Sequence, residues 1–319
     1  MSNHQVTDLR QSEEYASYMK NRGWKIENIK WQNSNVKIFI RGIPLLGSVI
    51  KIQRPEAIPP EKELDKLAEN HGALFIKVEP AINDQRSTIN DLQSDSWPLL
   101  PSKTLQLDLL KSGEELWENL DPDAKYSIRK ARSQLVAISD QESASIEKQR
   151  RLNEFYQLLK TTGKSKGFYT PKWLDLKAKA ECFGKKAWLI LAYRRRSIVH
   201  GKDKNRSSIV RHLSSPIAGC LLFIHDGIAY YHYAASSEEG RKLLAAYFVL
   251  WKAIKLAKSR GCHTFDFEGI YDGRFPKATR NWKGFTFFKK KFGGKEVEFP
   301  RPLIKYYSLP IKLLFKLFG

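Results

Sequence analysis

The sequence predicts an α/β protein with two similar layers, each a mixed sheet flanked by helices. Two observations support this fold class. In both halves of the chain, about three apolar runs typical of strands are followed by an amphipathic helix and a further strand. The chain of 319 residues, 42% hydrophobic, is also long enough for two domains. The halves share little sequence, so we expect the repetition in structure alone.

The first half, residues 1–145, is expected to form the first domain. Hydrophobic periodicity predicts helices near 11–22 and 61–71 and a basic helix near 113–133. Strands are expected near 24–31, 35–41, 47–53, 73–78 and 104–107.

The second domain is expected over residues 146–300. A connecting helix near 146–162 precedes strands at 186–193, 217–224 and 228–234, a helix at 242–260 and a strand at 263–267. The tail, residues 301–319, is basic and apolar. We expect it to pack as a closing helix on the first domain, although the same pattern could rest on an anionic bilayer.

The formal charge of +21 predicts an acidic partner such as nucleic acid, a phosphorylated metabolite or an anionic membrane surface. Three widely spaced cysteines read as reduced thiols, and the histidines have no metal-ligand spacing, so we expect no metal. The polar N-terminus lacks a signal peptide and no apolar run is long enough to span a membrane. A cytoplasmic protein is therefore expected.

The segment at residues 284–294 crowds Phe rings, three lysines (289–291) and two glycines together. Ammonium groups held among Phe rings are partly withdrawn from water, which strengthens their attraction for phosphate or an oxyanion. The segment thus predicts an anion site. The alternative is a strand edge that lysines protect against aggregation.

The junction at residues 235–241 leads from a strand into a helix, whose first amides suit a carboxylate or phosphate. Ser236 and Ser237 could instead simply cap that helix. Acyltransferases of the GNAT superfamily hold the pyrophosphate of acetyl-CoA at such a junction with a glycine-rich loop. Acidic side chains replace that loop here, which disfavours coenzyme A.

Several segments, in order over about 190 residues, resemble the FemABX family of peptidoglycan branching enzymes. These segments are, in family order, Leu107–Leu109, Leu116–Leu120, Tyr126–Ala131, Phe155–Thr162, Gly167–Tyr169, Ala229–Ser237, Trp251–Lys258, Phe265–Ile270 and Phe288–Gly294.

The resemblance implies two tandem GNAT-like subdomains. The family's long helical arm is not expected here, because no extended heptad pattern occurs. It also implies a cell-wall enzyme that moves an amino acid from aminoacyl-tRNA to the stem-peptide amine of lipid II or UDP-MurNAc-pentapeptide. Aminoacyl-tRNA would be a co-substrate, and no cofactor is expected. Independently of the resemblance, the basic and apolar tail would allow a peripheral contact with the inner face of the plasma membrane.

The resemblance also implies residue roles. Lys289, with Phe288, would engage the aminoacyl-tRNA end and stabilise charge during transfer. Substrate contacts would come from Tyr231, Tyr233, Ser236, Ser237 and Tyr169. Independently of the resemblance, Arg41 at the end of a strand could pair with an acceptor phosphate, or be an ordinary exposed strand terminus. The residues expected to contact tRNA are Lys290, Lys291, Arg129 and Lys130. The candidate bases are Asp108 and Asp266.

The sequence departs from the family pattern at Ala234, where glycine is usual, and at Gln53–Glu56, which lacks a glycine of the family's turn. These departures leave the acceptor open. Two other classes stay open as well: a GNAT-type N-acyltransferase with another donor or acceptor, and a non-catalytic RNA-binding protein.

Overall fold

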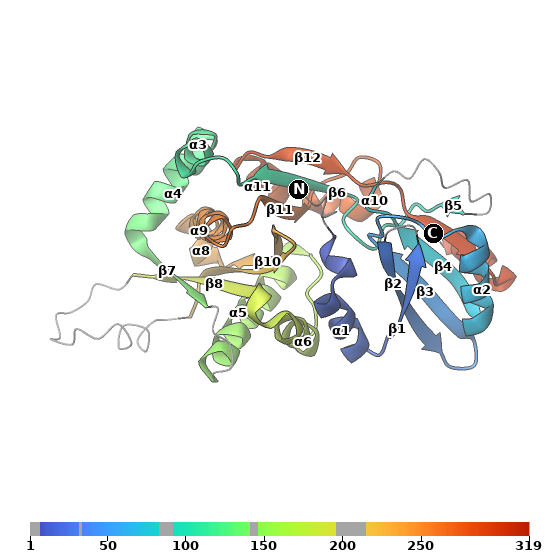
Figure 1. Ribbon diagram of the computed structural model, residues 1–319. Helices are drawn as coiled ribbons and strands as arrows, with labels where there is room; N and C mark the ends of the chain where they lie inside the picture. Colours follow the sequence, from blue (N-terminus) through green and yellow to red (C-terminus); the bar gives the residue numbers. More distant parts are fainter. Residues whose placement is uncertain (1–6, 32–33, 83–91, 141–145, 196–214, 319) are drawn as a thin grey trace. The chain divides into compact units, whose positions relative to one another are not determined.

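The computed structural model describes residues 7–31, 34–82, 92–140, 146–195 and 215–318 (Figure 1). Its contacts divide the chain into two compact units. Unit 1 comprises residues 1–104, 269–283 and 296–319, and unit 2 comprises residues 105–268 and 284–295. The expected boundary at 145/146 adjoins residues 141–145, which lie outside the described part. The contact-based division falls instead after Thr104, because two later segments return to unit 1.

Unit 1 is a six-stranded mixed sheet in the order β1-β2-β3-β4-β13-β5. Its strands are β1 (Lys25–Trp31), β2 (Ser34–Ile43), β3 (Gly47–Gln53), β4 (Ala73–Glu79), β5 (Gln93–Ser94) and β13 (Leu303–Tyr306). β2 pairs antiparallel with β1 and β3, and β3 pairs parallel with β4. The predicted strands at 24–31, 35–41, 47–53 and 73–78 are therefore confirmed.

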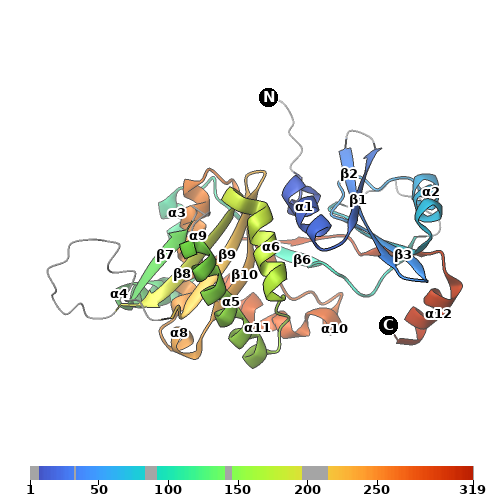
Figure 2. The same ribbon diagram turned by 90° about the horizontal axis from the view of Figure 1, so that it is seen from below.

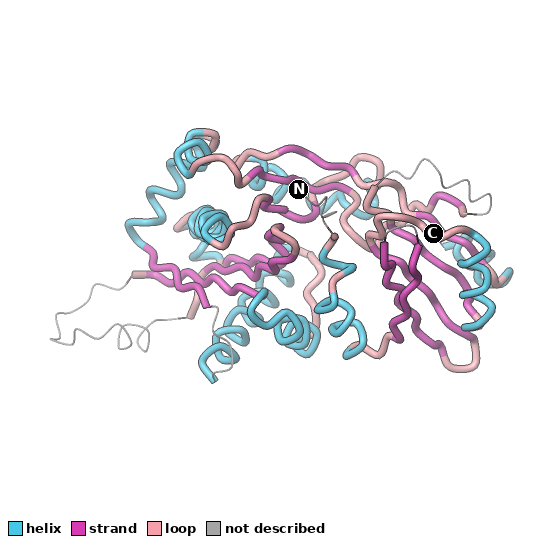
Figure 3. Tube along the Cα trace, in the orientation of Figure 1, coloured by secondary structure: helices cyan, strands magenta, loops and turns pink. Residues whose placement is uncertain are grey.

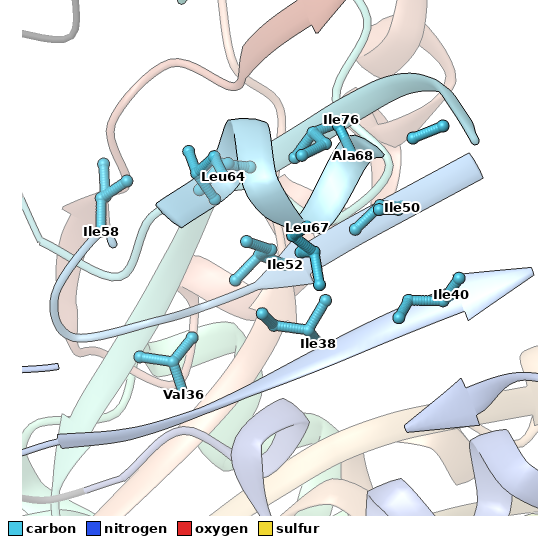
Figure 4. Close-up of a cluster of buried hydrophobic side chains, with 12 residues drawn as sticks. Val36, Ile38, Ile40, Ile50, Ile52, Ile58, Leu64, Leu67, Ala68 and Ile76 are labelled. Carbon is cyan, nitrogen blue, oxygen red and sulfur yellow. The ribbon is translucent and has the colours of Figure 1, made fainter. Parts of the chain in front are cut away.

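Helix α2 (Glu61–His71) covers one face of this sheet. Leu64 and Leu67 of α2 point toward Ile38, Ile50 and Ile52 of the sheet (Figure 4). These apolar side chains alternate along β2 and β3 and so share the face of the sheet that α2 covers. The helix ends at Gly72, which adopts a left-handed conformation with φ of 53°.

The other face of the sheet carries α1 (Glu13–Asn21), which follows the short helix η1 (Leu9–Gln11). Tyr15 of α1 meets Phe39 edge to face at 5.7 Å, and its hydroxyl donates to Gln53. Ser12 caps α1 by accepting from the backbone N–H of Tyr15.

The C-terminal tail belongs to unit 1. β13 pairs antiparallel with β4, and α12 (Leu309–Phe318) follows it. Phe315 of α12 packs against Phe75 and Tyr306, with ring centroids 5.7 and 6.0 Å apart. The tail is thus a strand followed by a helix, where the sequence suggested a helix alone.

Unit 2 contains most of a second, seven-stranded sheet in the order β12-β6-β11-β10-β9-β8-β7. These strands are β6 (Lys103–Asp108), β7 (Leu135–Asp140), β8 (Ala187–Arg194), β9 (Ala218–His225), β10 (Ile228–Ser236), β11 (Thr264–Gly269) and β12 (Lys295–Glu298). The helices around it, cyan in Figure 3, include α5 (Ile146–Lys166), α6 (Trp173–Phe183) and α9 (Ala245–Ser259). The predicted mixed α/β class with two helix-flanked sheets is confirmed.

Two predicted helices are interrupted. The helix expected at 113–133 is α3 (Gly113–Glu118) and α4 (Pro122–Gln134), because Asp121 caps a new helix whose first residue is proline. The helix expected at 242–260 is α8 (Glu238–Lys242) and α9, separated by Leu244 at φ of 57°. The segment at 284–294 begins in α11 (Lys283–Lys290), followed by Gly293 and Gly294 at positive φ.

Among the described residues, no helix combines the length and apolar character needed to span a membrane.

Candidate functional site

The candidate site lies in unit 2, where β10 and β11 stop pairing. These parallel strands pair over three residues, from Ile228↔Thr264 to Tyr230↔Asp266. Just beyond, the pairing of β10 with β9 shifts between Tyr231 and Tyr233, which leaves His232 as the extra residue of a bulge. Glu268 in β11 adopts a left-handed backbone, with φ of 59°. Bulges and strained backbone of this kind often aim side chains at functional sites.

His232 and Glu268 meet across this point. Nδ1 of His232 lies 3.2 Å from Oε1 of Glu268, and Nε2 lies 3.1 Å from Nζ of Lys179 in α6. A charged lysine only donates, so Nε2 accepts from Lys179 and Nδ1 carries the hydrogen that is donated to Glu268. Lys179 and Glu268 are buried. The three side chains therefore form a hydrogen-bonded chain whose two ends, Lys179 and Glu268, are buried.

Lys289 of α11 belongs to the same cluster. Its side chain is 8% exposed, and burial lowers the pKa of Lys289 to about 8, although the charges of Glu268 and Asp266 oppose that shift. Its Nζ lies 4.8 Å from the centroid of the Phe285 ring. The ammonium is thus held in an apolar setting beside two carboxylates, where it would act strongly on a developing negative charge.

Asp266 is buried and held by two donors. Nε2 of Gln106 lies 3.0 Å from Oδ2, and the backbone N–H of Glu268 donates to Oδ1 at 2.6 Å. This bond from Glu268 fixes the left-handed turn at the end of β11. Asp108, the other predicted base, is exposed and accepts from the backbone N–H of Leu110 at 2.9 Å. Asp108 thus caps a turn.

Phe288 anchors α11. Its ring lies 4.8 Å from that of Tyr247 and 5.5 Å from that of Phe292, both edge to face. Phe292 is buried and also stacks on Tyr247. Contact with this aromatic cluster fixes the helix that carries Lys289.

The predicted tRNA contacts divide into two groups. Lys290, Arg129 and Lys130 are exposed, and the two on α4 lie near the rings of Trp117 and Tyr126. Lys291 is buried and bonds to Asp121 at 3.1 Å and Asp123 at 2.6 Å. These bonds raise the pKa of Lys291, that with Asp123 most. Lys291 therefore links α11 to the start of α4.

The predicted substrate contacts of β10 differ in burial. Tyr231 is buried against Phe265, with ring centroids 6.0 Å apart, and belongs to the core. Tyr233 is half-buried, with Nζ of Lys179 5.7 Å above its ring. Ser237 accepts from the N–H of Gly240 and caps α8, and the carbonyl of Ser236 accepts from Arg241. Tyr233 is the one of these four whose ring adjoins the Lys179–His232 pair.

Two predicted substrate contacts lie elsewhere. Tyr169 is exposed after α5. Arg41 is exposed on β2 of unit 1, 5.7 Å from the ring of Trp24, and Nζ of Lys51 lies 4.3 Å from the same ring. Burial lowers the pKa of Lys51 to about 8, and the Arg41 charge adds to that shift while Glu79 opposes it. Two cations therefore share one aromatic ring.

His232, Glu268, Lys179 and Lys51 were not predicted from the sequence as site residues. A usable signal was present at Phe265–Glu268, where two acids alternate with phenylalanines in an otherwise apolar strand. Within the described ranges, no group of three or more His, Cys, Asp and Glu side chains is placed to hold a metal ion.

Comparison with known proteins gives three findings. Residues 202–314 match the FemAB family. The fold resembles that of FemX, with a TM-score of 0.75 and 18% identity, covering 98% of this chain and 96% of FemX. No curated protein matches the chain in sequence.

More distant structures share the fold. L-PGS from Bacillus licheniformis has a TM-score of 0.55 and 11% identity, covering 98% of this chain and 97% of that one. A tandem GNAT protein from the clavulanic acid biosynthesis pathway has a TM-score of 0.50 and 8% identity, covering 89% and 83%. Residues 202–314 are thus similar to the FemAB family, and the chain shares its fold with FemX over nearly its whole length.

Proposed function

We propose that this protein transfers an amino acid from aminoacyl-tRNA to the stem-peptide amine of a peptidoglycan precursor, either lipid II or UDP-MurNAc-pentapeptide. The observation that carries the proposal is Lys289, a buried lysine with a pKa of about 8 beside Glu268 and Asp266. It lies in the family-matched region, on the Phe-Lys segment that resembles the family's functional pair.

The chemistry needs charge stabilisation and proton transfer. The amine attacks the ester carbonyl, the new C–N bond forms, and the carbonyl oxygen becomes an oxyanion. An ammonium fixed beside that oxyanion stabilises the transition state by about 3–4 kcal/mol. The ester C–O bond then breaks, and the released ribose oxygen takes up a proton. Because the amine itself attacks, the reaction requires neither a side-chain nucleophile nor a cofactor.

The attacking amine must also lose a proton. Glu268 is the acceptor we favour, because it lies beside Lys289 and receives the Nδ1 hydrogen of His232. Asp266 already accepts two hydrogen bonds, and Asp108 is exposed in a turn. The proton taken by Glu268 balances the one given to the ribose oxygen.

The substrates would be held mainly by cations. Lys290, Arg129 and Lys130 are exposed and suit the tRNA backbone, a contact that reads no base sequence. Arg41 and Lys51, which share the Trp24 ring, suit an acceptor phosphate. Tyr233, Ser236 and Tyr169 are the remaining candidate acceptor contacts. The reaction would take place in the cytoplasm, where aminoacyl-tRNA is available.

The test measures transfer of radiolabelled amino acids from a mixed aminoacyl-tRNA pool to UDP-MurNAc-pentapeptide and to lipid II. Lys289→Ala is expected to lower the rate by about 10²–10³. The matched control is Lys185→Ala, which removes an exposed lysine remote in sequence.

Other outcomes would redirect the assignment. Tight tRNA binding without transfer to either acceptor, with Lys289→Ala changing only affinity and its salt dependence, would indicate an RNA-binding protein. Transfer that survives ribonuclease treatment of the donor would indicate a GNAT-type acyltransferase with another donor.

A further inference from the structure

Unit 1 presents two leucines at the tip of the β2–β3 hairpin. Leu45 is 105% exposed and Leu46 is 63% exposed, in the sequence Ile43-Pro44-Leu45-Leu46-Gly47. Adjacent, strongly exposed leucines on one tight turn are unusual for a surface that meets only water.

Folding does not require leucine at this tip. The N–H of Leu46 donates to the carbonyl of Ile43 at 3.1 Å, and Leu45 has φ of 65°. Proline at the second position and a positive φ at the third follow the pattern of a type II turn, where glycine or asparagine is favoured. A leucine here is conformationally unfavourable, and its side chain is fully exposed. A leucine at this position therefore has no role in folding and points to a contact outside the folded chain.

Helix α12 exposes a second set of leucines. Phe315 packs against Phe75 and Tyr306 and so holds the helix on the sheet. Leu309, Leu313 and Leu314 are each at least half exposed. Phe315 itself stays 46% exposed, and the leucines of α12 form a second apolar surface.

The two leucine sets extend from the same end of the sheet. The hairpin tip follows the last residue of β2 and precedes β3, and the N–H of Ser48 donates to the carbonyl of Gly72, just before β4. β13 runs antiparallel to β4, and the N–H of Tyr307 donates to Leu74, so α12 begins near the same end of β4. Figure 2 shows α12 at this end of the sheet, where β3 begins.

The surroundings are basic and aromatic. Arg41 and Lys25 lie at this end on β2 and β1, and Lys312 lies on α12. The nearby carboxylate of Glu27 is bonded to both Lys25 and His71. Residues 299–319 contain basic side chains and no acid. Trp24 and Tyr306 add the amphipathic rings that favour a membrane–water interface.

We infer that Leu45, Leu46, Leu309, Leu313 and Leu314 form a leucine surface that docks unit 1 on an anionic lipid bilayer. Charge complementarity favours an anionic bilayer as the partner. The leucines would insert at the boundary between headgroups and acyl chains, while the flanking cations bind the anionic headgroups. The proposal goes beyond amino acid transfer, since docking needs neither aminoacyl-tRNA nor an acceptor.

The experiment uses the full chain and sedimentation with vesicles of phosphatidylglycerol and phosphatidylcholine, compared with phosphatidylcholine alone. The wild type is expected to bind the anionic vesicles more strongly, and salt is expected to weaken that binding. The double variant Leu45→Gly/Leu46→Gln should bind at least about tenfold more weakly, as should Leu313→Gln/Leu314→Gln. The matched control, Leu99→Gln, replaces an equally apolar, exposed leucine at the opposite end of the sheet and should bind like the wild type.

Folding is checked by thermal unfolding, where Leu45→Gly should leave the midpoint unchanged or raise it, because glycine relieves the positive φ. Equal vesicle binding by wild type and both double variants would overturn the proposal. So would an equal loss in Leu99→Gln. Light scattering provides a separate check: a dimer that the double variants dissociate would assign the surface to a second copy of the chain instead.

Discussion

Nδ1 of His232 lies 3.2 Å from Oε1 of Glu268, and each residue occupies an irregular backbone position. His232 is the extra residue of a bulge in β10, and Glu268 has a positive φ in β11. In regular parallel strands, both side chains would follow the alternation of side chains between the two faces of the sheet. The two irregularities instead bring an imidazole and a carboxylate together beside Lys289.

Replacement of Glu268 tests the proposed proton acceptor. Glu268→Gln keeps the shape and removes the basic oxygen, so transfer should fall about 10²–10⁴-fold, within the usual range for a general base. The measurement is single-turnover transfer to UDP-MurNAc-pentapeptide. Asp108→Asn is the control and should change the rate less than about threefold. A large loss in Asp108→Asn with none in Glu268→Gln would assign the role to Asp108.

The pH profile of transfer reports on Lys289. Its pKa of about 8 lies well below the ordinary value, mainly because of burial. The ammonium should lose its proton as pH rises through about 8, and with it the stabilisation of the oxyanion. We therefore expect the single-turnover rate, corrected for ester hydrolysis, to fall above that pH. A rate that keeps rising to pH 10 would contradict a catalytic ammonium.

The same shift predicts a pH-dependent stability. Between pH 8 and 10.5 the unfolded chain retains the Lys289 proton while the folded chain releases it, so stability rises with pH in this window. Lys289→Met lacks this contribution. The free energy of unfolding of the wild type relative to Lys289→Met should therefore increase by up to about 3 kcal/mol from pH 8 to 10.5. Denaturant titrations at both pH values measure the difference, and parallel curves would show an unshifted lysine.

The glycine after the lysine segment is predicted to be structurally required. Gly294 has φ of 105°, and an added Cβ would lie 2.9 Å from the carbonyl oxygen of Gln106. Gly294→Ala should lower the free energy of unfolding by about 1–3 kcal/mol. Gly284→Ala is the matched control: nothing lies within 4 Å of its added Cβ, and helix propensity favours alanine there. Equal stability of the two variants would contradict this reading.

The sequence predicted most elements of both units, including strands β1 to β4 and the helix at 61–71. The alternation of Val36, Ile38 and Ile40 places three apolar side chains on one face of a strand and identifies it in the sequence. It did not predict β13, because Leu303–Tyr306 is too short to be distinguished from the helix that follows. Nor did it predict the break at Leu244, whose left-handed conformation is unusual for leucine.

The sequence alone determined the fold class, the excess of positive charge and the placement of Lys289 in a basic aromatic segment, since these depend on composition and short-range pattern. Only the tertiary structure decided which charged groups meet. Lys179, His232, Glu268 and Lys289 come from four separate elements, and their contacts depend on a bulge and a left-handed residue. Likewise, Leu45 and Leu313 are remote in the chain, and strand pairing alone brings their segments to one end of a sheet.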